Sequence, residues 1–392
     1  MRILILNRDY PRFLLDMYGS RPELCAATYS RQLAARNATL FGVADFYSHG
    51  FTAAGHEACE IHVNNTWLQS AWARENGLRT LGGSAPAAPP GRRAPDSPLS
   101  VAIGSARRRF LPVARRFLPR QLQKDEERIL AAQIESMKPD LILNQEMSYV
   151  RSSRLGRIVP QTTKVVGQIA SALPVGEDFT RYDLVVSSLP NMVQHFRALG
   201  VRAAMNALAF DSRVLEQVQL PATRDIAVSF VGSISADHRT RLRLLEALVP
   251  RVPLKVWGSG VDELPRSSPI RACYQGEAWG AEMYRVLARS RITINHHIDL
   301  AGGYSNNMRL YEATGCAALM IVDRGYNLTE MFVPEREVVT YSSISECVEA
   351  VERMLSNEGV RADIAAAGHR RTLSDHSYIR RTSAMLELFS AL

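Results

Sequence analysis

Short apolar runs alternate with longer segments of mixed polarity along most of the chain. This alternation predicts strands packed beneath helices, the pattern of a parallel α/β protein. In the first half, the expected strands cover residues 3–6, 59–63, 140–144, 164–169 and 184–187. The expected helices lie within 22–54, with a break near residues 41 and 42, and at 121–137 and 191–199.

The second half of the chain repeats this alternation. The expected strands cover residues 226–231, 254–257, 292–295, 318–322 and 338–341. The expected helices cover 239–248, 279–288, 306–316, 345–356, 360–368 and 378–391. Residues 318–322 are all apolar, which is typical of a strand covered on both faces. The chain therefore reads as two similar α/β folds in succession.

The length of 392 residues exceeds one ordinary core and suits two domains. We place the boundary in the polar segment 210–225, which carries Pro221. The predicted N-terminal domain is then residues 1–212 and the C-terminal domain residues 225–375. A final helix, 376–392, follows the second domain.

The composition is that of a globular protein, with 46% hydrophobic and 22% charged residues. The start, MRILILNRDYP, predicts a first strand rather than a signal peptide, and no apolar run has the length of a membrane span. The five cysteines form no CxxC pair, which favours a reducing compartment over a disulfide framework or a zinc site. We therefore expect a cytoplasmic protein.

One segment of the predicted N-terminal domain, about residues 82–120, breaks the pattern. It is rich in proline, and its eight arginines face only Asp96 as a counter-charge. One interpretation is a solvated insertion loop or linker. The other is a basic surface, Arg107–Arg120, that touches an anionic membrane at its inner face or a lipid-linked acceptor. Nucleic acid is not expected as a partner, because the aromatic residues here are too sparse for base stacking.

The most informative segment is the predicted helix 306–316 and the turn before it. Asn306, Asn307 and Met308 offer backbone amides at a helix N-terminus, and Arg309 adds a positive charge there. Such a helix start suits a diphosphate. Glu312, one turn further on, suits the two hydroxyls of a ribose. We therefore expect these residues to bind a nucleotide.

Other strand ends in the second half add candidate nucleotide contacts. Gly232, Ser233 and Arg239 lie between a strand and a helix, where glycine permits close approach and arginine meets negative charge. Gly258 follows the next strand. His296 lies in a polar loop, NHHID, beside a second histidine, but adjacent side chains on an extended chain point apart. A metal site is therefore not expected.

Longer stretches resemble a known family. Residues 41–61, FGVADFYSHGFTAAGHEACEI, resemble part of the N-terminal half of GT-B glycosyltransferases. Three stretches of the second half are similar to the C-terminal half of the group that includes the spore-maturation-protein-B-like (CgeB-like) enzymes. They are VSFVGSISADHRTRL, INHH and NNMRLYEATGCAALMIVDRGYNLTEMF. The resemblance implies two Rossmann-like domains facing across a cleft. The C-terminal domain would bind a nucleotide sugar, and the last helix would cross back onto the N-terminal domain.

A glycosyl transfer also needs acceptor contacts and, if it inverts the anomeric carbon, a base. Asp45, Asp9 and His49 are the candidates for catalysis, with His49 one helical turn beyond Asp45. Candidates for contacts with acceptor hydroxyls follow strands of the N-terminal domain and are Asn144, Gln145, Glu146 and Gln168.

The sequence thus predicts a metal-independent glycosyltransferase with no cofactor beyond a UDP- or other nucleotide-sugar donor. The acceptor hydroxyl could belong to a surface glycan, a lipid-linked glycan, a protein or a natural product. Many retaining relatives carry an acid eight positions before the ribose glutamate, where this chain has Tyr304. Retention and inversion both stay open. The alternatives are a nucleotide-sugar epimerase of the same fold and a non-catalytic nucleotide- or glycan-binding protein of the envelope or spore coat.

Overall fold

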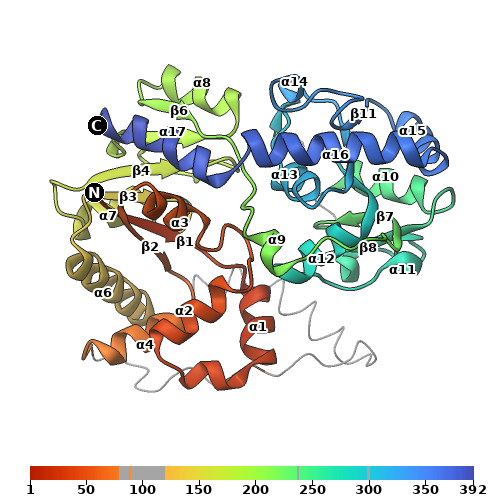
Figure 1. Cartoon of the computed structure of the whole chain (residues 1–392). Coiled ribbons are helices and arrows are strands. Elements are labelled where there is room, and N and C mark those ends of the chain that lie inside the picture. The colour runs from red at the N-terminus through yellow and green to blue at the C-terminus, as the bar shows by residue number, and fades with distance from the viewer. Residues whose placement is uncertain (79–87, 90–119, 236–237, 298–300) are drawn as a thin grey trace.

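The chain folds into two α/β domains that lie side by side, each built on one parallel sheet (Figure 1). The structure, a computed structural model, describes residues 1–78, 88–89, 120–235, 238–297 and 301–392. The basic insertion at about residues 82–120 therefore lies outside the described residues, apart from residues 88, 89 and 120. Among the described helices, none combines the length and apolar character that a bilayer crossing requires.

The N-terminal sheet has the order β2-β1-β3-β4-β5-β6, and each pair of neighbouring strands is parallel. Strand β1, which lies between β2 and β3, carries the run RILILN and is buried along most of its length, as a strand covered on both faces should be. The strands are β1 Arg2–Asn7, β2 Glu57–His62, β3 Leu141–Asn144, β4 Lys164–Gln168, β5 Leu184–Ser187 and β6 Ala203–Met205.

The C-terminal sheet has the order β11-β10-β9-β7-β8 and is parallel as well. Its strands are β7 Ile226–Val231, β8 Leu254–Trp257, β9 Ser290–Asn295, β10 Leu319–Asp323 and β11 Val339–Tyr341. The expected α/β class with two parallel-sheet domains is confirmed.

Helices cover both sheets. In the N-terminal domain they are α1 Pro11–Ser20, α2 Tyr29–Asn37, α3 Phe46–Ala53, α4 Thr66–Glu75, α6 Arg120–Met137, α7 Ser152–Ile158 and α8 Pro190–Ala198, with 3-10 turns η1 Pro22–Ala26 and η3 Phe179–Arg181. The helices that follow the N-terminal domain along the chain are α9 Val214–Gln217, α10 Arg239–Leu248, η4 Val261–Glu263, α11 Ile270–Cys273, α12 Ala281–Arg289, α13 Met308–Gly315, α14 Leu328–Met331, α15 Ile344–Ser356, α16 Glu358–Asp375 and α17 Tyr378–Ser390.

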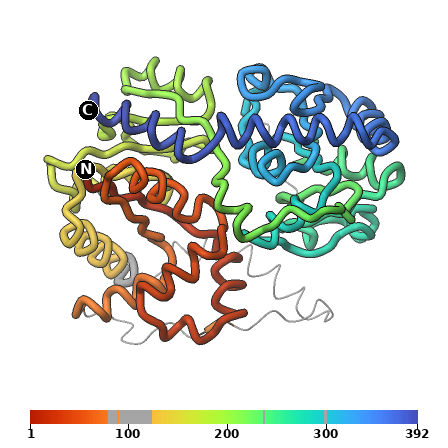
Figure 2. The backbone as a smooth tube through the Cα atoms, viewed as in Figure 1, coloured from red at the N-terminus to blue at the C-terminus, as the bar shows by residue number. Residues whose placement is uncertain are grey.

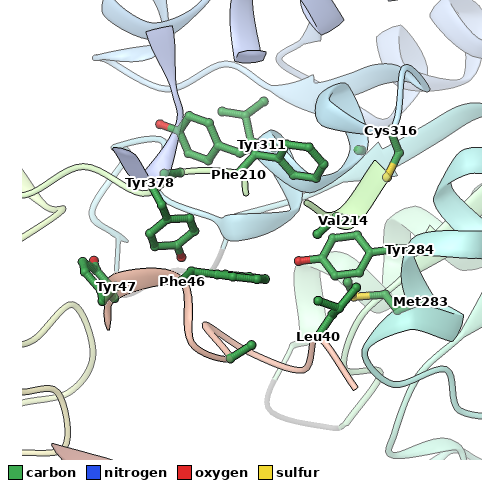
Figure 3. Close-up of a cluster of buried hydrophobic side chains, with 14 of the residues drawn as sticks. Leu40, Phe46, Tyr47, Phe210, Val214, Met283, Tyr284, Tyr311, Cys316 and Tyr378 are labelled. Atoms are coloured by element: carbon green, nitrogen blue, oxygen red, sulfur yellow. The ribbon is translucent and has the colours of Figure 1, made fainter. Parts of the chain in front are cut away.

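The two domains share one apolar cluster (Figure 3). Phe46 and Tyr47 reach it from α3, Phe210 from the segment that links the sheets, and Tyr284 from α12. All four side chains are almost fully buried. Burial of apolar surface contributes about 25 cal/mol per Å², so this shared cluster favours a fixed arrangement of the two domains.

The last helix, α17, runs back over the N-terminal domain, and both chain ends lie on that side (Figures 1 and 2). The chain crosses between the domains twice at one place, because the Phe210 amide donates to the His376 carbonyl at 2.8 Å and the Tyr378 amide to the Phe210 carbonyl at 3.2 Å. Beyond this crossing, α17 packs against α3 so closely that a Cβ atom on Gly50 would lie 2.7 Å from Thr382 Cγ2.

We predict that Gly50→Ala lowers the free energy of unfolding by about 1–3 kcal/mol, because the added methyl group overpacks the contact between α3 and α17. Gly359→Ala is the matched control, since a Cβ atom at Gly359 in α16 would meet open space. It should leave stability unchanged or raise it by up to about 1 kcal/mol. Urea unfolding of both variants checks this, and equal stabilities would contradict the packing described.

Candidate active site

A cleft of about 390 Å³ lies between the two domains, where strands of both sheets end. The N-terminal domain lines it with residues that follow β1 and β3, and the C-terminal domain with residues that follow β7 and β8 and with the start of α13. In open parallel sheets, ligands bind beyond the carboxyl ends of the strands. The position of this cleft therefore makes it the candidate active site.

The start of α13 lies in this cleft, as the sequence predicts. Asn307 is the N-cap, and its Oδ1 accepts from the Arg309 amide at 2.8 Å. Its Nδ2 donates to Asn295 Oδ1 at 2.9 Å, which ties the cap to the end of β9. Asn307, Met308, Arg309 and Glu312 all line the cleft, whereas Asn306 is not among the described lining residues.

Glu312 and Arg309 form an ion pair inside the cleft wall. Arg309 Nη1 donates to Glu312 Oε2 at 2.7 Å, and Arg309 Nε donates to the Val231 carbonyl at 3.0 Å. Tyr284 donates its hydroxyl to Glu312 Oε1 at 3.3 Å. A carboxylate oxygen can accept more than one hydrogen bond. The Glu312 carboxylate is therefore held in place and still has capacity for ligand hydroxyls.

Two glycine-containing loops complete the C-terminal wall, and both were predicted. Gly232, Ser233 and Gly258 line the cleft. Gly258 has φ +151°, and a Cβ atom there would collide with the Gly232 carbonyl. Only glycine permits this approach of the two loops, so the backbone of both can face a ligand.

Two predicted donor contacts lie away from the cleft. Arg239 is exposed at the start of α10, and neither it nor His296 is among the described lining residues. Arg241 is the buried arginine of that helix, and it donates to the carbonyls of Ser233 at 3.0 Å and His296 at 2.9 Å. It thus holds the loops together behind the cleft. Asp237 and Asp299, which belong to the quoted motifs, lie outside the described residues.

The two adjacent histidines do not point apart. His297 Nδ1 lies 2.7 Å from Asp323 Oδ1, and His296 Nδ1 lies 3.6 Å from Asp323 Oδ2. Both rings therefore reach the carboxylate at the end of β10. Across the ranges that the structure describes, no group of three or more histidine, cysteine, aspartate or glutamate side chains is placed to hold a metal ion.

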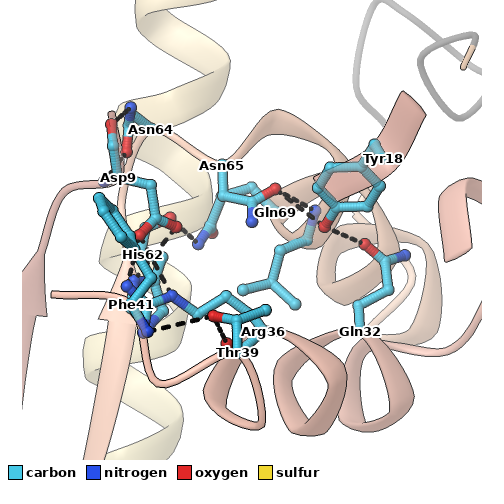
Figure 4. A network of polar contacts seen from close by, with 11 residues as sticks. Asp9, Tyr18, Gln32, Arg36, Thr39, Phe41, His62, Asn64, Asn65 and Gln69 are labelled. Carbon is cyan, nitrogen blue, oxygen red and sulfur yellow. Dashed lines mark hydrogen bonds and ion pairs between the residues drawn. The ribbon is translucent and has the colours of Figure 1, made fainter. Parts of the chain in front are cut away.

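Asp9, a predicted catalytic residue, is buried in a polar network (Figure 4). Its Oδ1 accepts from Arg36 Nη2 at 2.6 Å and from Arg36 Nε at 3.1 Å, and its Oδ2 lies 3.4 Å from His62 Nδ1. Burial alone would raise the pKa of Asp9, but His62 and Arg36 outweigh it and hold the pKa well below 3.8. Asp9 thus fixes Arg36, which lines the cleft, and does not line it itself.

Asp45 and His49 also lie outside the described lining of the cleft. Asp45 precedes α3 and pairs through Oδ1 with Arg213 Nη2 at 3.0 Å, and Arg213 pairs in turn with Asp211 at 2.8 Å. His49 is exposed on α3. The structure therefore does not bring the three predicted catalytic residues together at the cleft.

The predicted acceptor residues fall into two groups. Gln145, Glu146 and Gln168 line a second cavity of about 140 Å³ in the N-terminal domain. Asn144 is fully buried, and its Nδ2 donates to the Val150 carbonyl at 2.6 Å, which marks it as a structural residue. The contacts of the first three with an acceptor stay a prediction.

Sequence reasoning missed the aromatic residues that join the domains at the cleft. Tyr10 and Phe41 from the N-terminal domain pack edge-on against Trp279 from the C-terminal domain, with ring centroids 6.3 and 5.3 Å from it. Nearby, Arg12 pairs with Glu277 at 2.6 Å. Phe41 opens the stretch that resembles GT-B glycosyltransferases, and Tyr10 and Trp279 lie next to a predicted strand or helix end, but no sequence pattern pairs the three rings.

We predict that Asp9→Asn lowers the free energy of unfolding by about 3–5 kcal/mol, because it leaves the buried Arg36 charge without its partner. Glu352→Gln, which removes an exposed ion pair with Arg251, is the control and should cost less than about 1 kcal/mol. Because folding lowers the pKa of Asp9 below 3.8, its stabilisation is present above about pH 4 and is lost in acid. Urea unfolding of wild type and variant at several pH values measures this. A difference in the free energy of unfolding that does not change with pH would contradict it.

Comparison with known proteins agrees with the geometry. The family model described as "Glycosyl transferase-like" matches residues 239–387, which include α13. No curated protein matches the chain significantly. Among solved structures, the chain is similar to a glycosyltransferase from Rickettsia africae, with 11% identity, 100% of this chain and 98% of that chain covered, and a TM-score of 0.56.

Two further structures share the fold over nearly their whole length. AviGT4, a glycosyltransferase involved in avilamycin A biosynthesis, has 14% identity, a TM-score of 0.56, and coverage of 100% of this chain and 98% of that chain. HepE from Anabaena, solved in complex with UDP-glucose, has 11% identity, a TM-score of 0.55 and full coverage of both chains. The chain therefore has the GT-B fold, and its residues 239–387 match a glycosyl transferase-like family model.

Proposed function

We propose that this chain transfers a sugar from a nucleotide sugar to a hydroxyl group of an acceptor. One observation carries the proposal: the cleft places the Arg309–Glu312 pair at the N-terminus of α13 opposite polar residues of the N-terminal domain. A donor held by the C-terminal wall would have its sugar facing the other domain. The match of residues 239–387 to the glycosyl transferase-like family supports the same conclusion.

Glu312 would accept hydrogen bonds from the two ribose hydroxyls. Its carboxylate is nearly buried and fixed by Arg309 and Tyr284, so little side-chain freedom would be lost on binding. The diphosphate would lie near the amides that open α13, where the helix dipole favours negative charge. We propose UDP as the nucleotide to test first, because HepE was solved with UDP-glucose.

The departing nucleoside diphosphate carries negative charge, which the protein must stabilise as the glycosidic bond breaks. Positive groups on both walls of the cleft would supply this stabilisation. The C-terminal wall offers Arg309 and the α13 amides, and the opposite wall offers Arg8 and Arg36. We therefore propose transfer that needs no metal ion. The acceptor would enter from the N-terminal domain, through the cavity lined by Gln145, Glu146 and Gln168.

We predict that UDP or a UDP-sugar raises the melting temperature and that Glu312→Ala abolishes the shift. A ligand at 100 times its dissociation constant stabilises the folded state by about 2.7 kcal/mol. Glu349→Ala, on the exposed face of α15, is the matched control and should keep the full shift. The measurement is a thermal-shift screen of nucleoside diphosphates and nucleotide sugars on all three proteins.

The outcomes separate the proposed function from its alternatives. Binding followed by nucleoside diphosphate release with an acceptor supports transfer. Interconversion of two nucleotide sugars without acceptor would identify an epimerase, and binding with no turnover would identify a non-catalytic protein. If no nucleotide shifts the folded wild type, or if Glu312→Ala keeps the shift, the proposed donor site is wrong.

A further inference from the structure

The two cavities of the site meet at one carboxylate. Gln145 and Glu146 line both the interdomain cleft and the smaller cavity of the N-terminal domain. The cleft holds the proposed donor residues, including Glu312, whereas the smaller cavity is lined wholly by the N-terminal domain. An acceptor in the smaller cavity would meet the donor sugar at this junction, and Glu146 is the acidic side chain that both cavities share.

The position of Glu146 is fixed by its neighbours. Its backbone amide donates to Asn144 Oδ1 at 3.0 Å. Asn144 is itself held, because its Nδ2 donates to the Val150 carbonyl at 2.6 Å and to the Tyr182 hydroxyl at 3.3 Å. This buried support keeps the turn after β3 in place, so the Glu146 side chain projects from a rigid base.

The charges around Glu146 suit a group that gains and loses a proton near neutral pH. Burial raises its pKa to about 6, with Arg8 lowering the pKa and Asp9 raising it. The guanidinium of Arg8 lies over the Tyr149 ring, 5.2 Å from its centroid. A carboxylate with a pKa near 6 is ionised at pH 7 and still basic enough to accept a proton.

We propose that Glu146 is the general base of the transfer, an inference that rests on the proposed function. As the acceptor oxygen bonds to C1 of the sugar, its proton passes to the Glu146 carboxylate. The bond from C1 to the phosphate oxygen breaks, and its electron pair leaves with the nucleoside diphosphate. This single displacement inverts the configuration at C1.

The acids predicted for this role are placed less well. Asp9 is engaged by Arg36 and His62, and Asp45 by Arg213. Neither lines the cleft among the described residues, and neither does His49. A base must reach the proton that it removes, and Glu146 is the acid that the structure places where donor and acceptor would meet.

The test compares wild type, Glu146→Gln, Glu146→Asp and Glu57→Gln. The probes are the nucleotide sugar with the largest thermal shift and glucose as acceptor, and the readout is nucleoside diphosphate release from pH 5 to 8. We expect Glu146→Gln to lower kcat roughly 10²–10⁴-fold with an unchanged thermal shift from UDP.

The wild type should lose activity below about pH 6, and the Glu146→Gln variant should lack this loss of rate on the acidic side of the pH profile. Glu146→Asp should recover part of the rate, and Glu57→Gln, exposed on β2, should match wild type.

The anomeric configuration of the product provides a second readout, because a general base acting in one displacement requires inversion. Retention, or a Glu146→Gln variant with the rate and pH profile of wild type, overturns the assignment while leaving the transferase function intact. If the wild type binds nucleotide but releases none with glucose or water, the assignment fails together with the proposed transfer.

Discussion

The direction of the strands is the constraint on which the rest of the site depends. Each described pair of neighbouring strands is parallel, so the carboxyl ends of each sheet lie along one edge. The domains then face each other across these two edges. Residues far apart in sequence, such as Glu146 and Glu312, therefore line one cleft.

Two kinds of packing hold these edges in position. The apolar cluster around Phe46, Phe210 and Tyr284 spans both domains, and α17 returns across the same junction. Buried charges then fix single side chains at the cleft: Asp9 holds Arg36, and Arg309 holds Glu312. A buried ion pair contributes little net stability, but losing one partner is costly. These pairs thus orient charged groups for a ligand more than they stabilise the fold.

The sequence predicted the elements that have strong periodicity. Helix α10 and strands β5, β7 and β8 have the expected bounds, and α13 with Glu312 lies where it was expected. Helices α1 and α4 were not predicted. The buried residues of α1 (Phe13, Leu14, Met17 and Tyr18) do follow helical spacing, so this helix was overlooked. The buried residues of α4 are one leucine, one glutamine and two alanines, which give only a weak apolar signal. The base candidate Asp45 was chosen from its place at a helix start in the GT-B pattern, and His49 from its helical spacing to Asp45. Neither criterion shows which side chains meet the cleft. The CgeB-like subgroup stays a prediction, because the matching family model is described more broadly.

The central claim is that the cleft between the two sheets binds a nucleotide sugar with its ribose on Glu312. A crystal structure of the protein grown with UDP tests this most directly. The account predicts the two ribose hydroxyls within hydrogen-bond distance of the Glu312 carboxylate and the diphosphate at the start of α13. A nucleotide bound elsewhere, or one in the cleft with its ribose turned away from Glu312, would contradict it.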